Sequence, residues 1–336
     1  MRTQRPKSVQ KETAENIQHI FKEKGEKALQ IARELVAKEA QRITSKAGQA
    51  LQYFMNEYGN GVVGPALISL GCEAVEGNPV RTIHAAVPIV LISGSADIHD
   101  DIIDMTKIKN GRPTVYGKYG QDIAVLVGDA LLFKGLIAFQ TAAEHFSNDE
   151  FSKTARILND SFFLLGDAEA LEIRFRANLN VTPEEYLEVM WKKAADVEGL
   201  FRIGALLGGG VPHEIDVLGS YGRVFGLQSI LRDDWIDMIE FQELKHRIQF
   251  ESLPLPLLYL LEDDVIKSKI GPLLRGKITK KDAEHIYRTT QESGGFERTK
   301  KVMVHLAKKA ENSLSRASIL TPDLKAAMQF VWNVNG

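Results

Sequence analysis

Cysteine is nearly absent from this sequence, and so is any excess of charge of one sign. Cys72 is the only cysteine in 336 residues and lies in an apolar run. It cannot form a disulfide within the chain, which favours a buried small residue and a reducing, cytoplasmic setting. Lys and Arg number 42 against 44 Asp and Glu, a formal charge of −2. This balance argues against broad binding of nucleic acid or a membrane surface, so any charge-based function must be local.

Long apolar segments are missing too. The longest uncharged run, residues 82–96, is shorter than the roughly 20 residues that a membrane span needs, and acidic residues follow it. Residues 1–30 are charged throughout and lack the apolar core of a signal peptide. We therefore expect no signal peptide and no transmembrane segment, and we interpret residues 82–96 as a buried core helix.

Alternating apolar and polar residues, the pattern of half-buried strands, are nearly absent as well. Apolar residues instead recur at helical spacing, as in Ile17, Ile20 and Phe21. Thr182, Pro183 and Glu185 form a helix-start signature of N-cap, first-turn proline and capping box. The pattern predicts an all-α protein with about eleven or twelve helices. No linker is visible, so a single α-helical domain over residues 1–336 is expected.

An acidic cluster follows the apolar run, in the stretch "SADIHDDIIDMTKIKNGRPT". On a helix, residues three and four apart share a face, so Asp100, Asp101 and Asp104 are expected to point the same way, with Asp97 one turn earlier. A solvated acidic face would explain one such cluster. The buried character of the preceding residues weakens that reading.

A second cluster repeats the spacing in "ILRDDWIDMIEF", where Asp233, Asp234 and Asp237 end another apolar helix. Oxygen ligands without Cys or His favour Mg²⁺, which keeps several waters and completes its shell with substrate phosphates. Two such clusters facing each other could hold a diphosphate through bridging ions.

Longer segments around the clusters resemble one family in the right order: "HDDIIDMTKIKNGRPTVYGKYGQDIAVLVGDALL", "EEYLEVMWKKAADVEGLFRIGALLGG", "YGRVFGLQSILRDDWID" and "LPLPLLYLL". The chain resembles the trans-prenyl diphosphate synthases, or polyprenyl synthetases. The resemblance implies an isoprenoid synthase (class I terpenoid synthase) helical bundle around a central cavity, and a homodimer. It also implies two or three Mg²⁺ ions held by the catalytic aspartates of both motifs, namely Asp100, Asp101, Asp104, Asp233, Asp234 and Asp237.

The same resemblance assigns basic residues to an allylic prenyl diphosphate substrate. Lys109 matches the first arginine after the first motif, and Lys192, a catalytic candidate, matches the lysine of a Lys-Thr pair whose threonine is Lys193 here. Arg247 or Lys245 could replace a lysine that usually precedes the "LPL" helix. Arg232 could also reach a phosphate.

Chain length is indicated by Ser95 and Ala96, which match positions where bulky aromatic residues block the hydrophobic tunnel in short-chain enzymes. Small residues there imply a substrate of C20 or longer, unless another helix supplies the block. They also suit close helix packing.

Four donors to the second substrate, isopentenyl diphosphate, are missing. Gly61 and Gly64 in "NGVVGP" stand where the family has a lysine and an arginine, Ser93 replaces a histidine, and Asn110 replaces the second arginine of the "RRG" segment. Each charge-assisted hydrogen bond to a phosphate contributes about 1.5 to 3 kcal/mol. Ordinary binding of isopentenyl diphosphate is therefore not expected.

Three functions remain open. The first is an enzyme that ionises a long allylic diphosphate and transfers or cyclises the cation without isopentenyl diphosphate, so that the acceptor is unknown: water, a small nucleophile or the substrate's own alkene. The second is ordinary chain elongation, with a second site rebuilt from Arg81, Lys118 or Lys134. The third is a non-catalytic subunit of a heteromeric synthase, which the retention of six aspartates disfavours.

Overall fold

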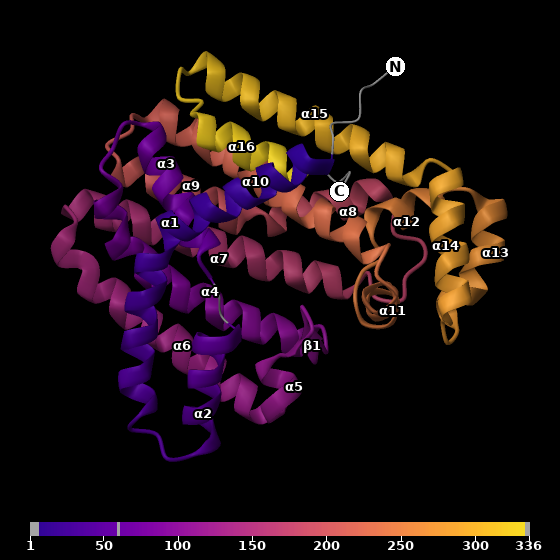
Figure 1. The fold of residues 1–336 in the computed structure, drawn as a ribbon, viewed down its shortest axis with the longest axis horizontal. Coiled ribbons are helices and arrows are strands. Elements are labelled where there is room, and N and C mark those ends of the chain that lie inside the picture. The colour runs from indigo at the N-terminus through magenta and orange to yellow at the C-terminus, as the bar shows by residue number, and fades with distance from the viewer. Residues whose placement is uncertain (1–6, 59–60, 333–336) are drawn as a thin grey trace. The chain divides into compact units, whose positions relative to one another are not determined.

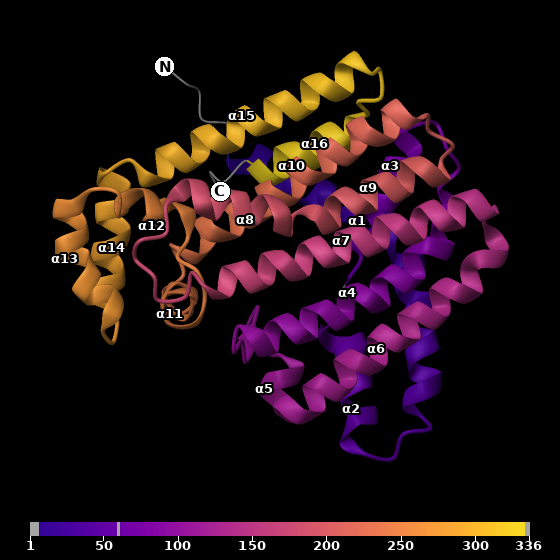
Figure 2. The same ribbon diagram turned by 180° about the vertical axis from the view of Figure 1, so that it is seen from behind.

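The structure is a computed structural model that describes residues 7–58 and 61–332. Within these residues the chain is almost entirely α-helical, and the only strands, β1 (Ile108–Lys109) and β2 (Arg112–Pro113), form one short hairpin. The all-α prediction is confirmed. Figure 1 and Figure 2 show the helices from opposite sides.

The chain divides into two compact units. The N-terminal unit comprises Ala14–Ile157 and Leu200–Asp216, and the C-terminal unit is built mainly from Leu158–Gly199 and residues 217–332. Four continuous helices have residues in both units: α1 (Lys7–Ala40), α7 (Asn148–Ile173), α9 (Ala195–Leu207) and α10 (Pro212–Asp237). A single domain remains a prediction.

The N-terminal unit holds most of α1 and the elements up to residue 145. They are α1 (Lys7–Ala40), α2 (Lys46–Tyr53), the π-helix η1 (Phe54–Tyr58), α3 (Val63–Ala74), the 3-10 helix η2 (Pro79–Thr82), α4 (Ile83–Ile103), β1, β2, α5 (Val115–Tyr119), α6 (Gln121–Thr141) and the 3-10 helix η3 (Ala142–His145). α4 and α6 pack side by side along their lengths (Figure 1, Figure 2).

α4 owes its position to its composition. The residues before its aspartates are apolar and mostly buried, as expected for residues 82–96. By length and composition alone, segment Pro79–Ile103 is apolar and long enough to cross a membrane. Of its most apolar window, however, 61% is buried, as in a core helix. Cys72 is fully buried in α3, as predicted.

The C-terminal unit contains the remaining helices. They are α8 (Pro183–Lys193), α11 (Phe241–Phe250), α12 (Leu255–Leu260), α13 (Asp264–Arg275), α14 (Lys280–Glu292), α15 (Gly295–Arg316) and α16 (Pro322–Trp332). The predicted start of α8 is confirmed, because Thr182 and Glu185 form both hydrogen bonds of a capping box.

Sixteen α-helices occur in the described residues, more than the eleven or twelve expected. Two of the extra helices are short, since α5 has 5 residues and α12 has 6. Segments this short contain too few turns to show helical periodicity in a sequence.

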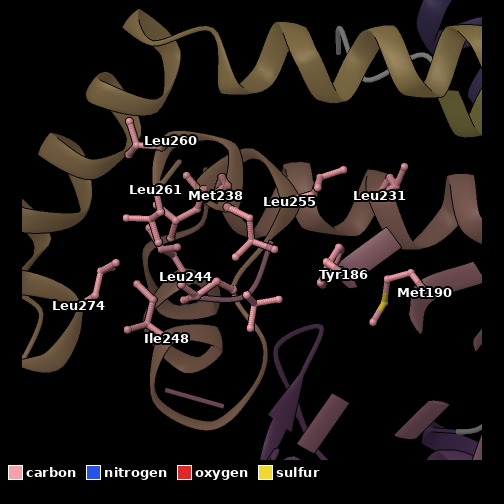
Figure 3. Packing of buried hydrophobic residues seen from close by; sticks show 14 of the residues in the cluster. Tyr186, Met190, Leu231, Met238, Leu244, Ile248, Leu255, Leu260, Leu261 and Leu274 are labelled. Carbon is pink, nitrogen blue, oxygen red and sulfur yellow. The ribbon is translucent and has the colours of Figure 1, made fainter. Parts of the chain in front are cut away.

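One apolar cluster organises the C-terminal unit (Figure 3). It joins buried side chains of α8, α10, α11, α12 and α13, among them Met190, Leu231, Leu244, Leu255 and Leu274. Tyr186 belongs to the same cluster and is fully buried. A buried tyrosine hydroxyl needs a hydrogen-bond partner, and its partner is part of the second acidic motif.

Candidate active site

The first acidic motif occupies the last turn of α4. The helix ends at Ile103, and the backbone N–H of Asp104 donates to the carbonyl oxygen of Asp100 at 2.8 Å. Asp101 is only 1% exposed, whereas Asp100 and Asp104 are partly exposed. The three carboxylates that were expected to point the same way therefore differ in their access to solvent.

The hairpin after this motif carries Lys109 and Asn110. The ammonium of Lys109 lies 3.8 Å from Oδ1 of the buried Asp101. Asn110 and Gly111 form the turn, with φ of 53° and 73°. Asn-Gly is favoured in two-residue turns that need positive φ at both positions, and an arginine there would be strained. The backbone of this turn therefore suits Asn110 better than an arginine.

The second acidic motif lies at the C-terminal end of α10, and its three members differ more sharply. Asp233 is exposed, the side chain of Asp237 is 20% exposed, and Asp234 is fully buried. Asp234 accepts hydrogen bonds from three sources: the hydroxyl of Tyr186 at 2.8 and 2.9 Å, the guanidinium of Arg247 at 2.6 Å, and the backbone N–H of Leu255 at 3.0 Å.

Arg247 connects this motif to α11. Besides Asp234, its guanidinium lies 3.8 Å from Asp237 and 3.2 Å from Glu251, and its side chain is 13% exposed. Of the two basic residues considered from the sequence, Arg247 rather than Lys245 lies at the second motif. Burial alone would raise the pKa of Glu251, but the hydrogen bond from His246 and the charge of Arg247 outweigh it and lower that pKa to about 2.

Lys192 and Lys193, at the end of α8, pair with carboxylates of α7. Lys192 contacts Asp167 at 2.9 Å. Lys193 lies 3.0 Å from Glu169 and 2.7 Å from Glu172. Sequence reasoning did not find these acidic partners, although "GDAEALE" carries three of them within six positions. It also missed Tyr186, because an isolated tyrosine gives no sequence signal for a buried hydrogen bond.

The other candidate substrate residues are Arg232 in α10, and Ser95 and Ala96 in α4. The guanidinium of Arg232 stacks on the ring of Phe330, 4.6 Å from its centre. Ser95 is buried and Ala96 is partly exposed. A Cβ atom added at Gly94, next to them, would lie 2.7 Å from the ring of Phe54, so an aromatic side chain from η1 already packs against this part of α4.

The carboxylates of the two motifs are of the kind that binds Mg²⁺. In the parts of the chain that the structure describes, no three His, Cys, Asp or Glu side chains converge as a ready-made metal site. Mg²⁺ needs only one or two carboxylates beside water and phosphate oxygens. Oδ1 of Asp100 is buried and has no hydrogen-bond partner among the described residues, as expected of an atom that binds a cation. The donor set fits Mg²⁺.

The stability of the folded protein is expected to depend on pH through Asp237. Burial raises the pKa of Asp237 to about 7, despite the opposing charge of Arg247. Its folded-state pKa exceeds the ordinary 3.8, so the folded protein binds a proton that the unfolded chain releases, and stability falls as pH rises from about 4 to 7. Without metal, Asp237→Asn should therefore be more stable than wild type by a few kcal/mol at about pH 8.

Thermal unfolding of both proteins across this pH range is the measurement. The advantage of Asp237→Asn should shrink toward about pH 5. An advantage that does not change between these pH values would contradict the assigned pKa.

Comparison with known proteins places the chain. The sequence model of the polyprenyl synthetase family matches residues 44–285. The short chain isoprenyl diphosphate synthase of Methanothermobacter thermautotrophicus is 36% identical over 53% of this chain and 54% of its own length. The geranylgeranyl diphosphate synthase of Methanosarcina mazei is 29% identical over 74% of this chain and 78% of its own length. This chain thus spans about half the length of the first relative and more of the second.

Solved structures agree on the fold. The geranylgeranyl pyrophosphate synthetase of Pyrococcus horikoshii superposes with a TM-score of 0.78 at 24% identity, covering 94% of this chain and 98% of that one. A polyprenyl synthetase of Streptomyces coelicolor gives 0.77 at 23% identity, covering 91% and 98%. Since the family match extends over more than half of the sequence, with both acidic motifs inside it, the chain belongs to the polyprenyl synthetase family.

Proposed function

We propose that this protein is a Mg²⁺-dependent prenyltransferase that binds a long allylic prenyl diphosphate, ionises it, and transfers or cyclises the prenyl group without isopentenyl diphosphate as acceptor. One combination of features carries the proposal. The carboxylates suited to Mg²⁺ are retained, with Oδ1 of Asp100 left unpaired among the described residues, while the cations for a second diphosphate are missing.

Each motif offers carboxylates to Mg²⁺. Asp100 and Asp104 in the first motif, and Asp233 and Asp237 in the second, are at least partly exposed and can reach a hydrated ion. Two or three bound Mg²⁺ ions would neutralise the departing diphosphate. The chain's own cations would complete the charge balance near each motif, with Lys109 beside the first and Arg247 beside the second.

Lys192 and Lys193 are proposed to bind diphosphate only in competition with their carboxylate partners. Arg247, Lys192 and Lys193 together face six carboxylates: Asp234, Asp237, Glu251, Asp167, Glu169 and Glu172. This surplus of negative charge supports a site that needs divalent cations before it accepts an anion.

The residues at the expected isopentenyl diphosphate site support the use of another acceptor. A Cβ atom added at Gly61 would meet no described atom within 4 Å, and one at Gly64 would meet only Leu200, at 3.8 Å. Two of the three cations considered as replacements already bind carboxylates: Arg81 contacts Glu150 and Lys134 contacts Glu39, each at 2.7 Å. Lys118 lies over the ring of Tyr53, 3.6 Å from its centre.

Chain elongation with isopentenyl diphosphate is the second candidate function. The names of the relatives favour it, since those reported above are isoprenyl or geranylgeranyl diphosphate synthases. Lys118 is then the cation best placed to change, because its described contacts are with the rings of Tyr53 and Tyr119 rather than with a carboxylate. A non-catalytic subunit has less support, because both acidic motifs are complete.

One assay separates these functions. The pure protein and Mg²⁺ are incubated with C10 to C25 allylic diphosphates, with and without isopentenyl diphosphate, and the lipid products are identified by mass spectrometry. Diphosphate release without isopentenyl diphosphate, greatest for the longer substrates, is expected. Products that form only with isopentenyl diphosphate would establish elongation, and no turnover of any substrate would favour the non-catalytic subunit.

A homodimer is proposed as well, through an exposed apolar face of α6. Leu126, Phe133 and Ile137 recur on one side of this helix and are 58%, 69% and 51% exposed. Phe133→Glu is expected to weaken dimerisation by about 10²-fold, because it places a charge in a desolvated apolar contact. Sedimentation equilibrium measures the change. Val80→Glu, at an apolar residue of η2 that is 61% exposed, is the matched control and should leave the dimer intact.

A further inference from the structure

Asp234 is held differently from the other two carboxylates of its motif. Its donors come from three separate elements: Tyr186 in α8, Arg247 in α11, and the first residue of α12, Leu255. Arg247 donates to Oδ1 and Leu255 donates to Oδ2, while the single hydroxyl hydrogen of Tyr186 is shared between the two oxygens. With both oxygens occupied and the side chain fully buried, a hydrated cation has no route to this carboxylate.

Helix geometry separates Asp234 from its neighbours. Asp233 and Asp237 are four residues apart and share one face of α10, while Asp234 points about 100° away. In that direction Asp234 accepts hydrogen bonds from Tyr186 and Leu255. Both of these residues belong to the apolar cluster shown in Figure 3. The exposed fractions follow the same division, since Asp233 is exposed and Asp234 is not.

We propose that Asp234 is a positioning residue and not a metal ligand. It fixes the guanidinium of Arg247 beside Asp237, and it fixes the start of α12 through the N–H of Leu255. The negative charge of Asp234 compensates a buried guanidinium that would otherwise be costly to desolvate. The metal-binding part of this motif is then Asp233 and Asp237 alone. The inference rests on the proposed function only for its binding readout.

Binding of inorganic pyrophosphate, measured by calorimetry over a series of Mg²⁺ concentrations, tests the assignment. In Asp233→Asn and Asp237→Asn, the Mg²⁺ concentration for half-maximal binding should rise at least about 10-fold, since a ligand is lost. In Asp234→Asn and Tyr186→Phe that concentration should stay the same. Pyrophosphate affinity should instead fall by roughly 3- to 10-fold at every Mg²⁺ concentration, because Arg247 is no longer fixed.

Stability gives a second readout and a control. Tyr186→Phe should lower the metal-free melting temperature by about 3 to 8 °C, because a hydrogen bond to a charged group is lost. Tyr221→Phe is the matched control. Tyr221 is 1% exposed and donates to the backbone oxygen of Leu324. The Tyr221→Phe variant should be less stable than wild type, without any change in its affinity for pyrophosphate.

Two results would overturn the assignment. One is a shift of the Mg²⁺ midpoint in Tyr186→Phe, or in a folded Asp234→Asn, as large as in Asp233→Asn. The other is an unchanged pyrophosphate affinity in both of those variants. If Asp234→Asn does not fold, Tyr186→Phe decides alone.

If the wild type binds no pyrophosphate, the proposed function fails separately from the positioning role. That role is then judged by the melting temperature of the double variant Tyr186→Phe/Asp234→Asn. A loss smaller than the sum of the single losses supports it, because the two groups share one hydrogen bond. A fully additive loss contradicts it.

Discussion

Replacing Gly61 with lysine and Gly64 with arginine is expected to strengthen the binding of isopentenyl diphosphate by about 10²- to 10⁴-fold. Two charge-assisted hydrogen bonds of about 1.5 to 3 kcal/mol each correspond to such a change. Wild type should show little affinity, since no side chain extends from either position. Calorimetric titration of both proteins with isopentenyl diphosphate measures the effect.

The structure permits this double substitution. A Cβ atom at Gly61 meets no described atom within 4 Å. Gly64 lies in the first turn of α3, where its Cβ would make only an ordinary contact of 3.8 Å with Leu200. Asn110 should not be replaced by arginine, because its φ of 53° in the hairpin turn would strain an arginine.

Gly61→Gln with Gly64→Gln is the control, because it adds side chains at the same positions without charge. It should leave the affinity for isopentenyl diphosphate unchanged. Tight binding by the wild type, with no gain in the lysine and arginine variant, would contradict the prediction and support chain elongation through a rebuilt site.

Asp100→Asn is expected to lower the rate of diphosphate release from an allylic diphosphate by about 10²- to 10³-fold. Oδ1 of Asp100 is the buried acceptor without a partner among the described residues, so it is the oxygen best suited to the metal. An amide oxygen binds Mg²⁺ more weakly than a carboxylate does, and a loss of this size is typical when one group that stabilises the developing charge is removed. Initial rates of diphosphate release provide the measurement.

The Asp100→Asn variant is expected to be as stable as wild type or more stable, although its rate of diphosphate release falls. Replacing a partly buried charge by a neutral amide removes a desolvation cost of that charge, so the metal-free melting temperature should stay the same or rise. Asp129→Asn is the control. Asp129 lies on α6 in the same unit and is 61% exposed, 3.4 Å from His99. Equal loss of rate in both variants, or unfolding of Asp100→Asn, would contradict the assignment of Asp100 to the metal.

Much of the architecture follows from local pattern. Helical spacing of apolar residues and the near absence of alternating patterns predicted an all-α fold, and the capping box at Thr182 located the start of α8 to the residue. These features depend on neighbours within one or two turns, which a sequence displays directly. The short helices α5 and α12 were not predicted, because they have too few residues to show a helical period.

The chemistry of the sites is less local. Arg247 and Lys245 are two residues apart and therefore lie on different sides of α11. The sequence alone could not choose between them, whereas packing placed Arg247 against Asp234. The partners of Lys192 and Lys193 lie on α7, more than 20 residues earlier in the chain, and no spacing rule links them.

The sequence by itself determined the helical class, the two aspartate motifs, and the loss of side chains at Gly61 and Gly64, because these are properties of residue type and spacing. Only the tertiary structure distinguished the members of each motif. Asp233 and Asp234 are identical and adjacent, yet one is exposed and the other is buried against Tyr186, Arg247 and Leu255. Burial depends on contacts between distant segments, so the same residue type becomes a candidate metal ligand at one position and an internal anchor at the next.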